Sequence, residues 1–192
     1  LRQANPGFRA RSLLLEGGLL RRADLVEESL AVFNRGLRDY PGNTELRYGR
    51  AMTRIMDGDL NGGETDLRRI LQDDPDDART LNALGYTLVD QTDRTAEGAA
   101  LIERAYAIEP DDPAIIDSMG WAAYRQGDPE RALGYLRRAH ELTDGDAEIA
   151  AHLGEVLWVL GQREAARDVW AQAAANDADH PVLRETRERL NP

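Results

Sequence analysis

PAIIDSMGWAAYRQGDPERALGYLRRAHELTDGD, residues 113–146, is the stretch that decides the fold, because the chain on both sides repeats its spacing. Placing it above residues 147–180 aligns four pairs of small residues, each pair 34 residues apart: Gly120 and Gly154, Gly127 and Gly161, Ala132 and Ala166, Ala139 and Ala173. Small residues at this spacing allow two short amphipathic helices to cross closely. A period of this length is typical of a solenoid in which each helical pair packs on its neighbours.

Five such repeats account for residues 10–178, starting near residues 10, 44, 78, 113 and 147. Residues 1–9 fit the tail of a preceding repeat's second helix, and residues 179–192, rich in Arg and Glu, fit a capping helix with a polar outer face. We therefore predict an all-α solenoid of about five helix-turn-helix repeats plus a C-terminal capping helix. Because the chain opens at Leu1 without a methionine, we expect a fragment, and any targeting or lipidation signal would then lie upstream of Leu1.

Two repeats depart from the common pattern. The third is one residue longer, since Pro75 and Pro110 are 35 residues apart, and we place the extra residue in the turn DQTDRT, residues 90–95, where few contacts depend on it. The second carries arginine at three positions of its first helix where apolar residues usually pack: Arg47, Arg50 and Arg54. Its helical face is therefore unlike that of the later repeats.

Composition narrows the classes of function. The chain is 42% hydrophobic and 31% charged, which suits a folded helical protein, and its apolar runs are far shorter than the ~20 residues that span a bilayer. A net charge of −11 opposes binding to nucleic-acid phosphates. With no cysteine, disulfides and thiolate metal sites are excluded, and this composition is compatible with either the cytosol or an oxidising compartment.

The spacing and small residues resemble the tetratricopeptide repeat (TPR) family, whose pattern is W-x2-L-G-x2-Y, then A-x3-F, then A and P. The chain departs from it at the first aromatic, where Leu81, Ile116 and Ala150 stand. The second-helix aromatic position carries Phe33, Leu67, Ile102, Leu136 and Trp170. The resemblance implies a scaffold that binds a protein or peptide partner and catalyses nothing.

Three longer stretches resemble the carboxyl-terminal arrays of proteobacterial proteins of this family: LNALGYTLVD, IIDSMGWAAYRQGD and IAAHLGEVLWVLGQREAARDVW. Such proteins include outer-membrane lipoproteins that act as adaptors for a carboxyl-terminal processing protease and its cell-wall hydrolase substrates. This resemblance implies a periplasmic scaffold, anchored through an upstream lipoprotein signal. A cytoplasmic location is the alternative.

The first helix of each repeat lines the concave surface in this family, at positions two, five, nine and twelve. Counting along the repeats, with neighbouring polar groups added, gives a candidate partner-binding groove: Tyr48, Asn82, Tyr86, Asp117, Trp121, Tyr124, Arg125, His152, Glu155 and Trp158. Exposed Trp and Tyr anchor many interfaces, and an Asn amide pairs with both groups of a peptide backbone. The alternatives are that Trp121 and Trp158 fill gaps between repeats, and that the polar groups form a solvated surface. Trp170, on a second helix, is expected in the core.

Catalytic and metal-binding motifs are poorly supported. Residues 57–62, DGDLNG, match the first half of a calcium loop, but the twelfth position, which needs a bidentate Glu, is Arg68. The three histidines have no zinc-ligand spacing, and no phosphate loop or nucleophile motif is present. We therefore predict no catalytic residues, no metal and no cofactor.

A second hypothesis is structural. Phe8, Leu13, Leu14 and Leu15 would give the amino-terminal face an apolar surface on which a second copy or an upstream domain could pack. On this hypothesis the chain is a self-association module or an extension of a longer array.

Overall fold

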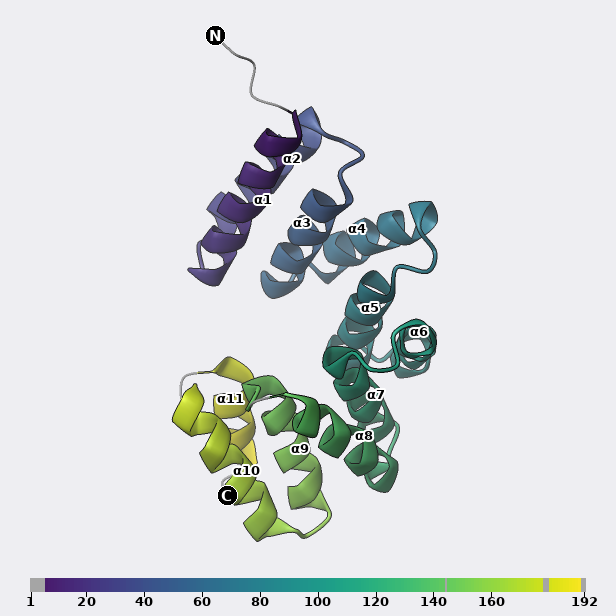
Figure 1. Cartoon of the computed structure of the whole chain (residues 1–192), viewed down its shortest axis with the longest axis vertical. Helices are drawn as coiled ribbons and strands as arrows, with labels where there is room; N and C mark the ends of the chain where they lie inside the picture. The colour runs from purple at the N-terminus through teal and green to yellow at the C-terminus, as the bar shows by residue number, and fades with distance from the viewer. Residues whose placement is uncertain (1–5, 144, 178–179, 191–192) are drawn as a thin grey trace. The chain divides into compact units, whose positions relative to one another are not determined.

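The computed structural model describes residues 6–143, 145–177 and 180–190, which form eleven helices and no strand (Figure 1). The helices are α1 (Pro6–Arg22), α2 (Val26–Asp39), α3 (Thr44–Met56), α4 (Leu60–Asp73), α5 (Ala78–Gln91), α6 (Thr95–Ile108), α7 (Pro113–Arg125), α8 (Pro129–Leu142), α9 (Ala147–Val159), α10 (Arg163–Asn176) and α11 (Pro181–Leu190). The predicted all-α class is confirmed.

Four of the five predicted repeat starts coincide with the first residue of a helix, at Thr44, Ala78, Pro113 and Ala147. The exception is the first repeat, because α1 begins at Pro6 and residues 6–9 form its first turn rather than the end of a preceding helix. Residues 1–5 of that predicted tail lie outside the described residues, as do residues 179, 191 and 192 of the predicted capping segment, whose helix is α11.

The extra residue of the third repeat lengthens a helix instead of a turn. α5 has 14 residues, whereas α3, α7 and α9 have 13 each. The residues that link α5 to α6 are 92–94, as many as in the other hairpin turns. The insertion was therefore predicted in the correct stretch, but it is absorbed by one further helical residue.

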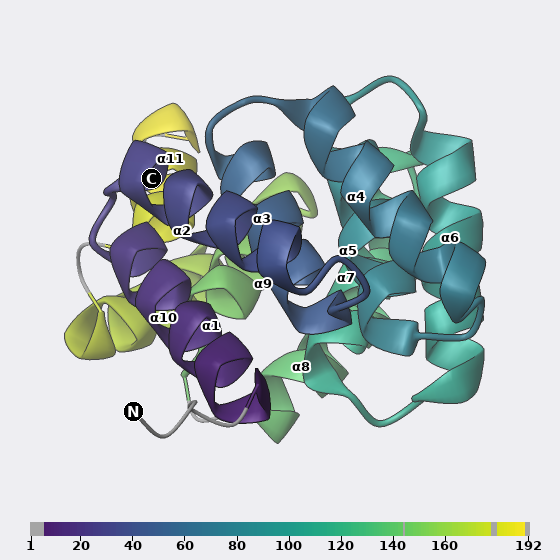
Figure 2. The ribbon, with the colours of Figure 1, turned by 90° about the horizontal axis from the view of Figure 1, so that it is seen from above.

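The chain divides into two compact units, residues 1–84 and 85–192, with the boundary inside α5. In the first unit α1 packs against α2, as Figure 2 shows, α3 packs against α4, and α3 also contacts α1 and α2. In the second unit α7 pairs with α8 and α9 with α10, while α11 packs on α9. Within each unit, hairpins of neighbouring sequence pack on one another.

Glycine at the helix crossings allows the two helices of a hairpin to approach closely. A Cβ added to Gly120 would lie 2.6 Å from Cγ of Leu136 on α8. A Cβ added to Gly154 would overlap the indole of Trp170 on α10. Leu136 and Trp170 occupy equivalent places in successive hairpins, so the register predicted from the small residues is confirmed.

The remaining small residues of the register form the core between helices. Ala132, Ala139 and Ala166 have no exposed surface, and Ala173 is 1% exposed. Trp170 is also 1% exposed, so its predicted core position is confirmed. Large side chains of one helix therefore fill the space that the alanines and glycines of its partner leave.

Helix ends follow the residues expected of them. The Asp112 carboxylate accepts hydrogen bonds from the backbone N–H groups of Ala114 and Ile115. The Asp128 carboxylate accepts one from the backbone N–H of Arg131. Gly127 and Gly161 follow α7 and α9 with φ of +87° and +78°, a conformation that side chains with a Cβ rarely adopt. These caps and turns set the three-residue connections within hairpins.

The calcium-like stretch forms the turn between α3 and α4. The Asp59 carboxylate accepts a hydrogen bond from the N–H of Gly62 and thereby caps α4. No group of three or more His, Asp or Glu side chains in the described part of the chain is placed to hold a metal ion. Among the same residues, no helix combines the length and the apolar character needed to cross a bilayer.

Replacing Ala166 with Leu should overpack the α9–α10 hairpin, because Ala166 has no exposed surface. We expect the free energy of unfolding to fall by about 1 to 3 kcal/mol, measured by urea denaturation. The adjacent Ala165 is exposed and gives a matched control, since Ala165→Leu adds the same side chain to the outer surface of α10. Equal losses in the two variants would contradict this account of the crossing.

Candidate functional site

The ten predicted groove residues are divided between the two units. Tyr48 and Asn82 belong to the first unit. The other eight belong to the second: Tyr86, Asp117, Trp121, Tyr124, Arg125, His152, Glu155 and Trp158. Each group is therefore described within its own unit.

In the first unit an arginine covers the predicted tyrosine. The Arg79 guanidinium carbon lies 4.2 Å from the centroid of the Tyr48 ring, and Arg79 also forms an ion pair of 2.6 Å with Glu45. Burial raises the pKa of the Tyr48 hydroxyl above its ordinary value. Asn82 Oδ1 is buried and has no hydrogen-bond partner among the described residues. The predicted role of Asn82 as an acceptor for a peptide N–H is therefore not available in this conformation.

In the second unit a buried histidine links three helices. His152 on α9 is 2% exposed, and its Nδ1 lies 2.9 Å from Oδ2 of Asp117 on α7. Its Nε2 lies 3.3 Å from the Tyr86 hydroxyl on α5, and that hydroxyl donates to Glu148 Oε1 at 3.0 Å. The predicted site residues Tyr86, Asp117 and His152 are thus brought together, but beneath the surface.

The electrostatics of this cluster favour a charged imidazole. Burial lowers the pKa of His152, but the charge and hydrogen bond of the Asp117 carboxylate outweigh it, so the net pKa lies above its ordinary value of 6.5. A protonated imidazole donates from both nitrogens, to Asp117 and to the Tyr86 oxygen. Burial, followed by the charge of Glu148, raises the pKa of the Tyr86 hydroxyl, so Tyr86 stays neutral and acts as a donor.

Trp121 is a packing residue rather than an exposed anchor. It is 7% exposed, and its ring stacks on His152 with a centroid distance of 4.2 Å and an interplanar angle of 20°. Its indole N–H donates to Asp90 Oδ1 at 3.1 Å. The prediction that Trp121 presents its ring in a groove is therefore wrong in this structure. The alternative, that it fills a gap between repeats, is correct.

A second polar link joins α7, α9 and α11. The Tyr124 hydroxyl donates to Glu155 Oε1 at 3.0 Å, and the other Glu155 oxygen pairs with Arg189. Glu155 is buried, and its side chain is 4% exposed. Burial, and then the Glu155 carboxylate, raise the pKa of Tyr124 to about 12. Glu155 is thus held inside the unit and does not present a free carboxylate to a partner.

The two remaining predicted residues lie nearer the surface. Arg125 is exposed, and it donates to the Asp90 carbonyl oxygen at 3.0 Å. Trp158 is half-buried and packs on Trp170 with a centroid distance of 5.9 Å. Arg163 of α10 lies over the Trp158 ring at 4.9 Å, so this ring contacts its own hairpin.

The sequence analysis did not predict the side chains that hydrogen-bond to the polar groups of this face, although the sequence contains a pattern that indicates them. Polar pairs recur between residues about one repeat apart, namely Glu45 with Arg79, Asp90 with Trp121 and Arg125, Asp117 with His152, Tyr124 with Glu155, and Glu155 with Arg189. Their separations are 31 to 35 residues. Donors and acceptors at matching places in successive repeats could have been paired before the structure was known.

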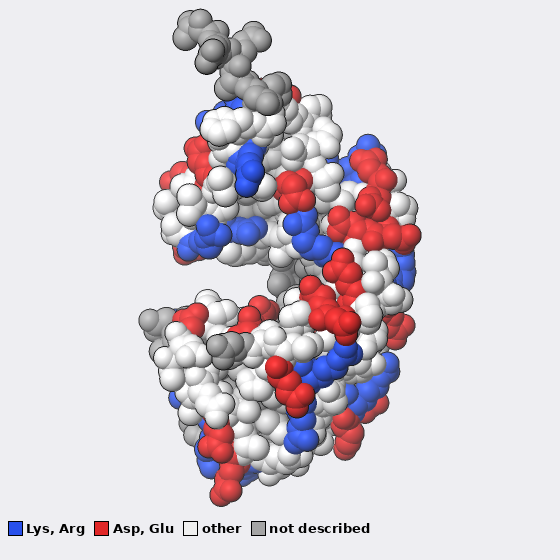
Figure 3. Space-filling model, in the orientation of Figure 1, with Lys and Arg blue, Asp and Glu red and all other residues white. Residues whose placement is uncertain are grey.

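These contacts hold the helices of the second unit in fixed positions. The buried groups satisfy one another, so α7 is tied to α5, α9 and, through Glu155, α11. Tyr124, Arg125 and Trp158 retain surface that a partner could contact. On the face shown in Figure 3, acidic and basic side chains lie interspersed over each unit.

Comparison with known proteins identifies the family of these repeats. Sequence models of the tetratricopeptide repeat match residues 48–113 and 123–190, together more than half of the chain. The TPR repeat-containing protein PA4667 of Pseudomonas aeruginosa is 44% identical over 154 residues, which cover 80% of this chain and 26% of that protein. The chain thus spans about a quarter of the length of this relative.

Solved structures share the fold. The crystal structure of TTC0263, a thermophilic TPR protein of Thermus thermophilus, matches with a TM-score of 0.82 at 20% identity, covering 95% of this chain and 98% of that one. The Pseudomonas aeruginosa pilF structure matches with a TM-score of 0.74 at 16% identity, covering 96% and 84%. At these identities the likeness concerns the fold alone.

His152→Gln should lower the free energy of unfolding more at acidic than at alkaline pH. Because the pKa of His152 is raised above 6.5 in the folded protein, its ion pair with Asp117 contributes fully below that value and is lost as the pH rises through the folded-state pKa. Urea unfolding of both proteins from about pH 5.5 to 9 measures the difference.

Asp117→Asn is the control for this prediction, because it keeps the size of the side chain and removes the carboxylate. Near neutral pH or below, we expect it to cost about 3 kcal/mol, since a buried charge loses its partner. A difference between the wild type and His152→Gln that stays constant over the whole pH range would contradict the ion pair.

Proposed function

We propose that this chain, which belongs to the tetratricopeptide repeat family, is a non-enzymatic scaffold that holds a partner polypeptide on the first-helix face of its second unit. Proteins of this family act as protein-interaction scaffolds. The observation that carries the proposal is the buried polar network of α5, α7 and α9, which fixes a face whose outer groups remain partly exposed. A face fixed in advance loses little conformational entropy on binding.

The contact groups of this face are Tyr124, Arg125 and Trp158. Tyr124 and Trp158 are half-buried, so neighbouring side chains hold part of each residue while the rest stays exposed. Rings held in this way add contact area without ordering new rotamers, and Arg125 adds donors for a peptide carbonyl or carboxylate. Trp121 supports this face from beneath instead of contacting the partner.

We propose further that the partner is a carboxyl-terminal processing protease and that the chain acts in the periplasm, as part of a longer adaptor that presents cell-wall hydrolases. Two observations support this choice. The three stretches at residues 81–90, 115–128 and 149–170 resemble such adaptors, and the chain is 44% identical over 154 residues to a Pseudomonas protein of which those residues make up 26%. A lipoprotein anchor would belong to the longer protein.

The double variant Tyr124→Ala, Arg125→Ala tests the face. Glu155 keeps its ion pair with Arg189 in this variant, so the fold should persist. We expect capture of a purified carboxyl-terminal processing protease by the immobilised chain to weaken by at least about tenfold, measured by surface plasmon resonance.

Tyr135→Ala is the matched control, because Tyr135 is a half-buried tyrosine on a second helix, α8. It should leave capture unchanged. Full capture by a folded double variant would reject the face. If the wild-type chain does not bind the protease but binds other periplasmic proteins, the protease is not its partner, while the proposed scaffold function still holds.

A specific surface favours the second candidate function, self-association or extension of a longer array. Phe8, Leu15 and Leu19 on α1 are 69%, 60% and 59% exposed, and their spacing places them on one helical face. The predicted apolar surface differs in two members. Leu13 is 6% exposed and packs in the core with Phe33, and Leu14 is half-buried and packs against the same core. The exposed stripe is of the kind that another helix covers.

Sedimentation velocity over a concentration range tests this candidate. Self-association through α1 predicts a sedimentation coefficient that rises with concentration, and Leu15→Glu with Leu19→Glu should abolish the rise. Leu142→Glu is the control, since Leu142 is an exposed leucine at the end of α8. A wild-type chain that is monomeric at every concentration would count against self-association.

A further inference from the structure

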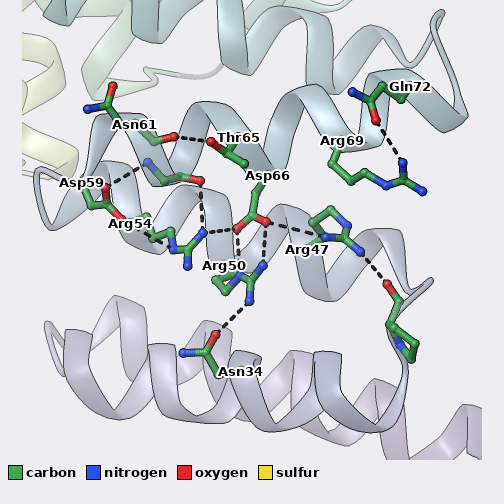
Figure 4. Close-up of polar contacts among 12 residues, drawn as sticks. Asn34, Arg47, Arg50, Arg54, Asp59, Asn61, Thr65, Asp66, Arg69 and Gln72 are labelled. Atoms are coloured by element: carbon green, nitrogen blue, oxygen red, sulfur yellow. Dashed lines mark hydrogen bonds and ion pairs between the residues drawn. The ribbon is translucent and has the colours of Figure 1, made fainter.

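The second repeat contains a cluster of arginines where the later repeats have core residues. Arg47, Arg50 and Arg54 lie on the side of α3 that faces α2 and α4, as Figure 4 shows. One repeat later, the same positions are Leu81, Leu84 and Leu88, which are 0%, 0% and 1% exposed. The fold itself therefore accepts leucine at these positions.

One buried carboxylate holds the cluster. Asp66 on α4 is 2% exposed and accepts two hydrogen bonds from Arg50, at 2.8 and 2.7 Å. Arg54 donates to the same carboxylate at 2.9 Å, and Arg47 lies 3.8 Å from it (Figure 4). Asp59, at 3.7 Å, adds a partial partner for Arg54. Three guanidinium groups thus share one buried carboxylate, and the cluster keeps an excess of positive charge.

Stability alone gives no reason for this arrangement. Buried ion pairs are often matched or exceeded in stability by apolar side chains of similar volume, because charges lose their hydration on burial. The neighbouring repeat, with its three leucines, is an example of that solution in the same chain. The arginines therefore call for another role.

A pocket of about 380 Å³ opens beside the cluster, and its walls offer donors without an opposing acid. It is lined by Asn34, Leu37, Arg38, Pro41, Arg47 and Arg50. Three of these residues are arginines, and none is acidic. The chain as a whole has a net charge of −11, so the positive charge of this pocket is opposite to that of the whole protein.

Several donors on the pocket wall have room for a ligand. Arg38 is exposed and has no ion-pair or hydrogen-bond partner among the described residues. Asn34 Oδ1 accepts from Arg50 at 2.9 Å, which leaves the amide N–H groups of Asn34 free to donate. The side chains of Arg47 and Arg50 are 19% and 17% exposed, so their outer edges reach the pocket.

We propose that this pocket binds the carboxylate of a glutamate or aspartate side chain in an acidic segment of a partner polypeptide. The guanidinium forks and the Asn34 amide match two carboxylate oxygens, and Leu37 and Pro41 give an apolar wall for the methylene carbons behind the carboxylate. The pocket belongs to the first unit, whereas the first-helix face proposed above belongs to the second. This proposal rests on the proposed function only because it takes the ligand to be part of a polypeptide.

The test uses a dye-labelled peptide of six glutamates and a matched glutamine peptide, titrated with the whole chain at about 50 mM salt, where charge pairs are weakly screened. Fluorescence anisotropy should show binding of the glutamate peptide and not of the glutamine peptide. Arg38→Glu should weaken binding by about tenfold, as expected for the loss of a charge-assisted contact. Because no described residue pairs with Arg38, this variant should stay folded, and its melting temperature should fall only by the small effect of a negative charge in the last turn of α2. Arg22→Glu makes the same change in the last turn of α1, so the two variants should melt at similar temperatures.

Arg22→Glu is the matched control, because it changes the net charge equally on an exposed arginine at the far end of the α1–α2 hairpin. It should leave peptide affinity within twofold of the wild type. Equal weakening by the two variants, or equal binding of the two peptides, would overturn the proposal. Inorganic phosphate binding as tightly as the glutamate peptide would also overturn it, in favour of a simple oxyanion site.

Failure of this test is distinguishable from failure of the proposed function. The glutamate peptide needs no protease, and the Tyr124→Ala, Arg125→Ala variant should bind it as the wild type does. If the peptide binds and the protease does not, the pocket stands and the choice of partner is wrong. If the protease is captured and the peptide is not, the first-helix face stands alone.

Discussion

Close contact between the two helices of each hairpin is the constraint on which the structure depends. Gly120 and Gly154 let α8 and α10 bring Leu136 and Trp170 against the backbone of the preceding helix. A side chain at either glycine would push the helices apart and open the core at that hairpin. Because neighbouring hairpins within each unit also pack on one another, a defect at one crossing would affect its neighbours in that unit as well.

In the second unit, polar groups also join the first helices of successive hairpins into one rigid face. The links from Tyr86 through His152 to Asp117, and from Tyr124 through Glu155 to Arg189, lie mostly out of water. An unpaired group at such a depth is costly, so each link holds the spacing and rotation of the helices that it joins. If this face binds the partner as proposed, its geometry is fixed before binding, which reduces the ordering that binding requires.

The first unit uses charge differently. Its second repeat replaces a leucine core by arginines around Asp66, and the positive pocket that results uses residues of α3 other than Tyr48 and Glu45. One chain can thus carry two kinds of surface, one with aromatic rings beside single charges and the other cationic. Repeat proteins allow this because each repeat can change its exposed groups while the crossings stay the same.

The sequence by itself determined the helix class, the repeat starts at Thr44, Ala78, Pro113 and Ala147, and the crossings at Gly120 and Gly154. These features follow from local spacing, helix caps and the size of single residues, all of which can be read along the chain. Only the tertiary structure decided whether a given ring faces solvent or the core. Trp121 is buried because His152 and Asp90, each 31 residues away, meet its ring and its N–H, and helical periodicity does not specify such partners. The same holds for Arg47 and Arg50. Their placement at core positions depends on one carboxylate, that of Asp66 on the next helix.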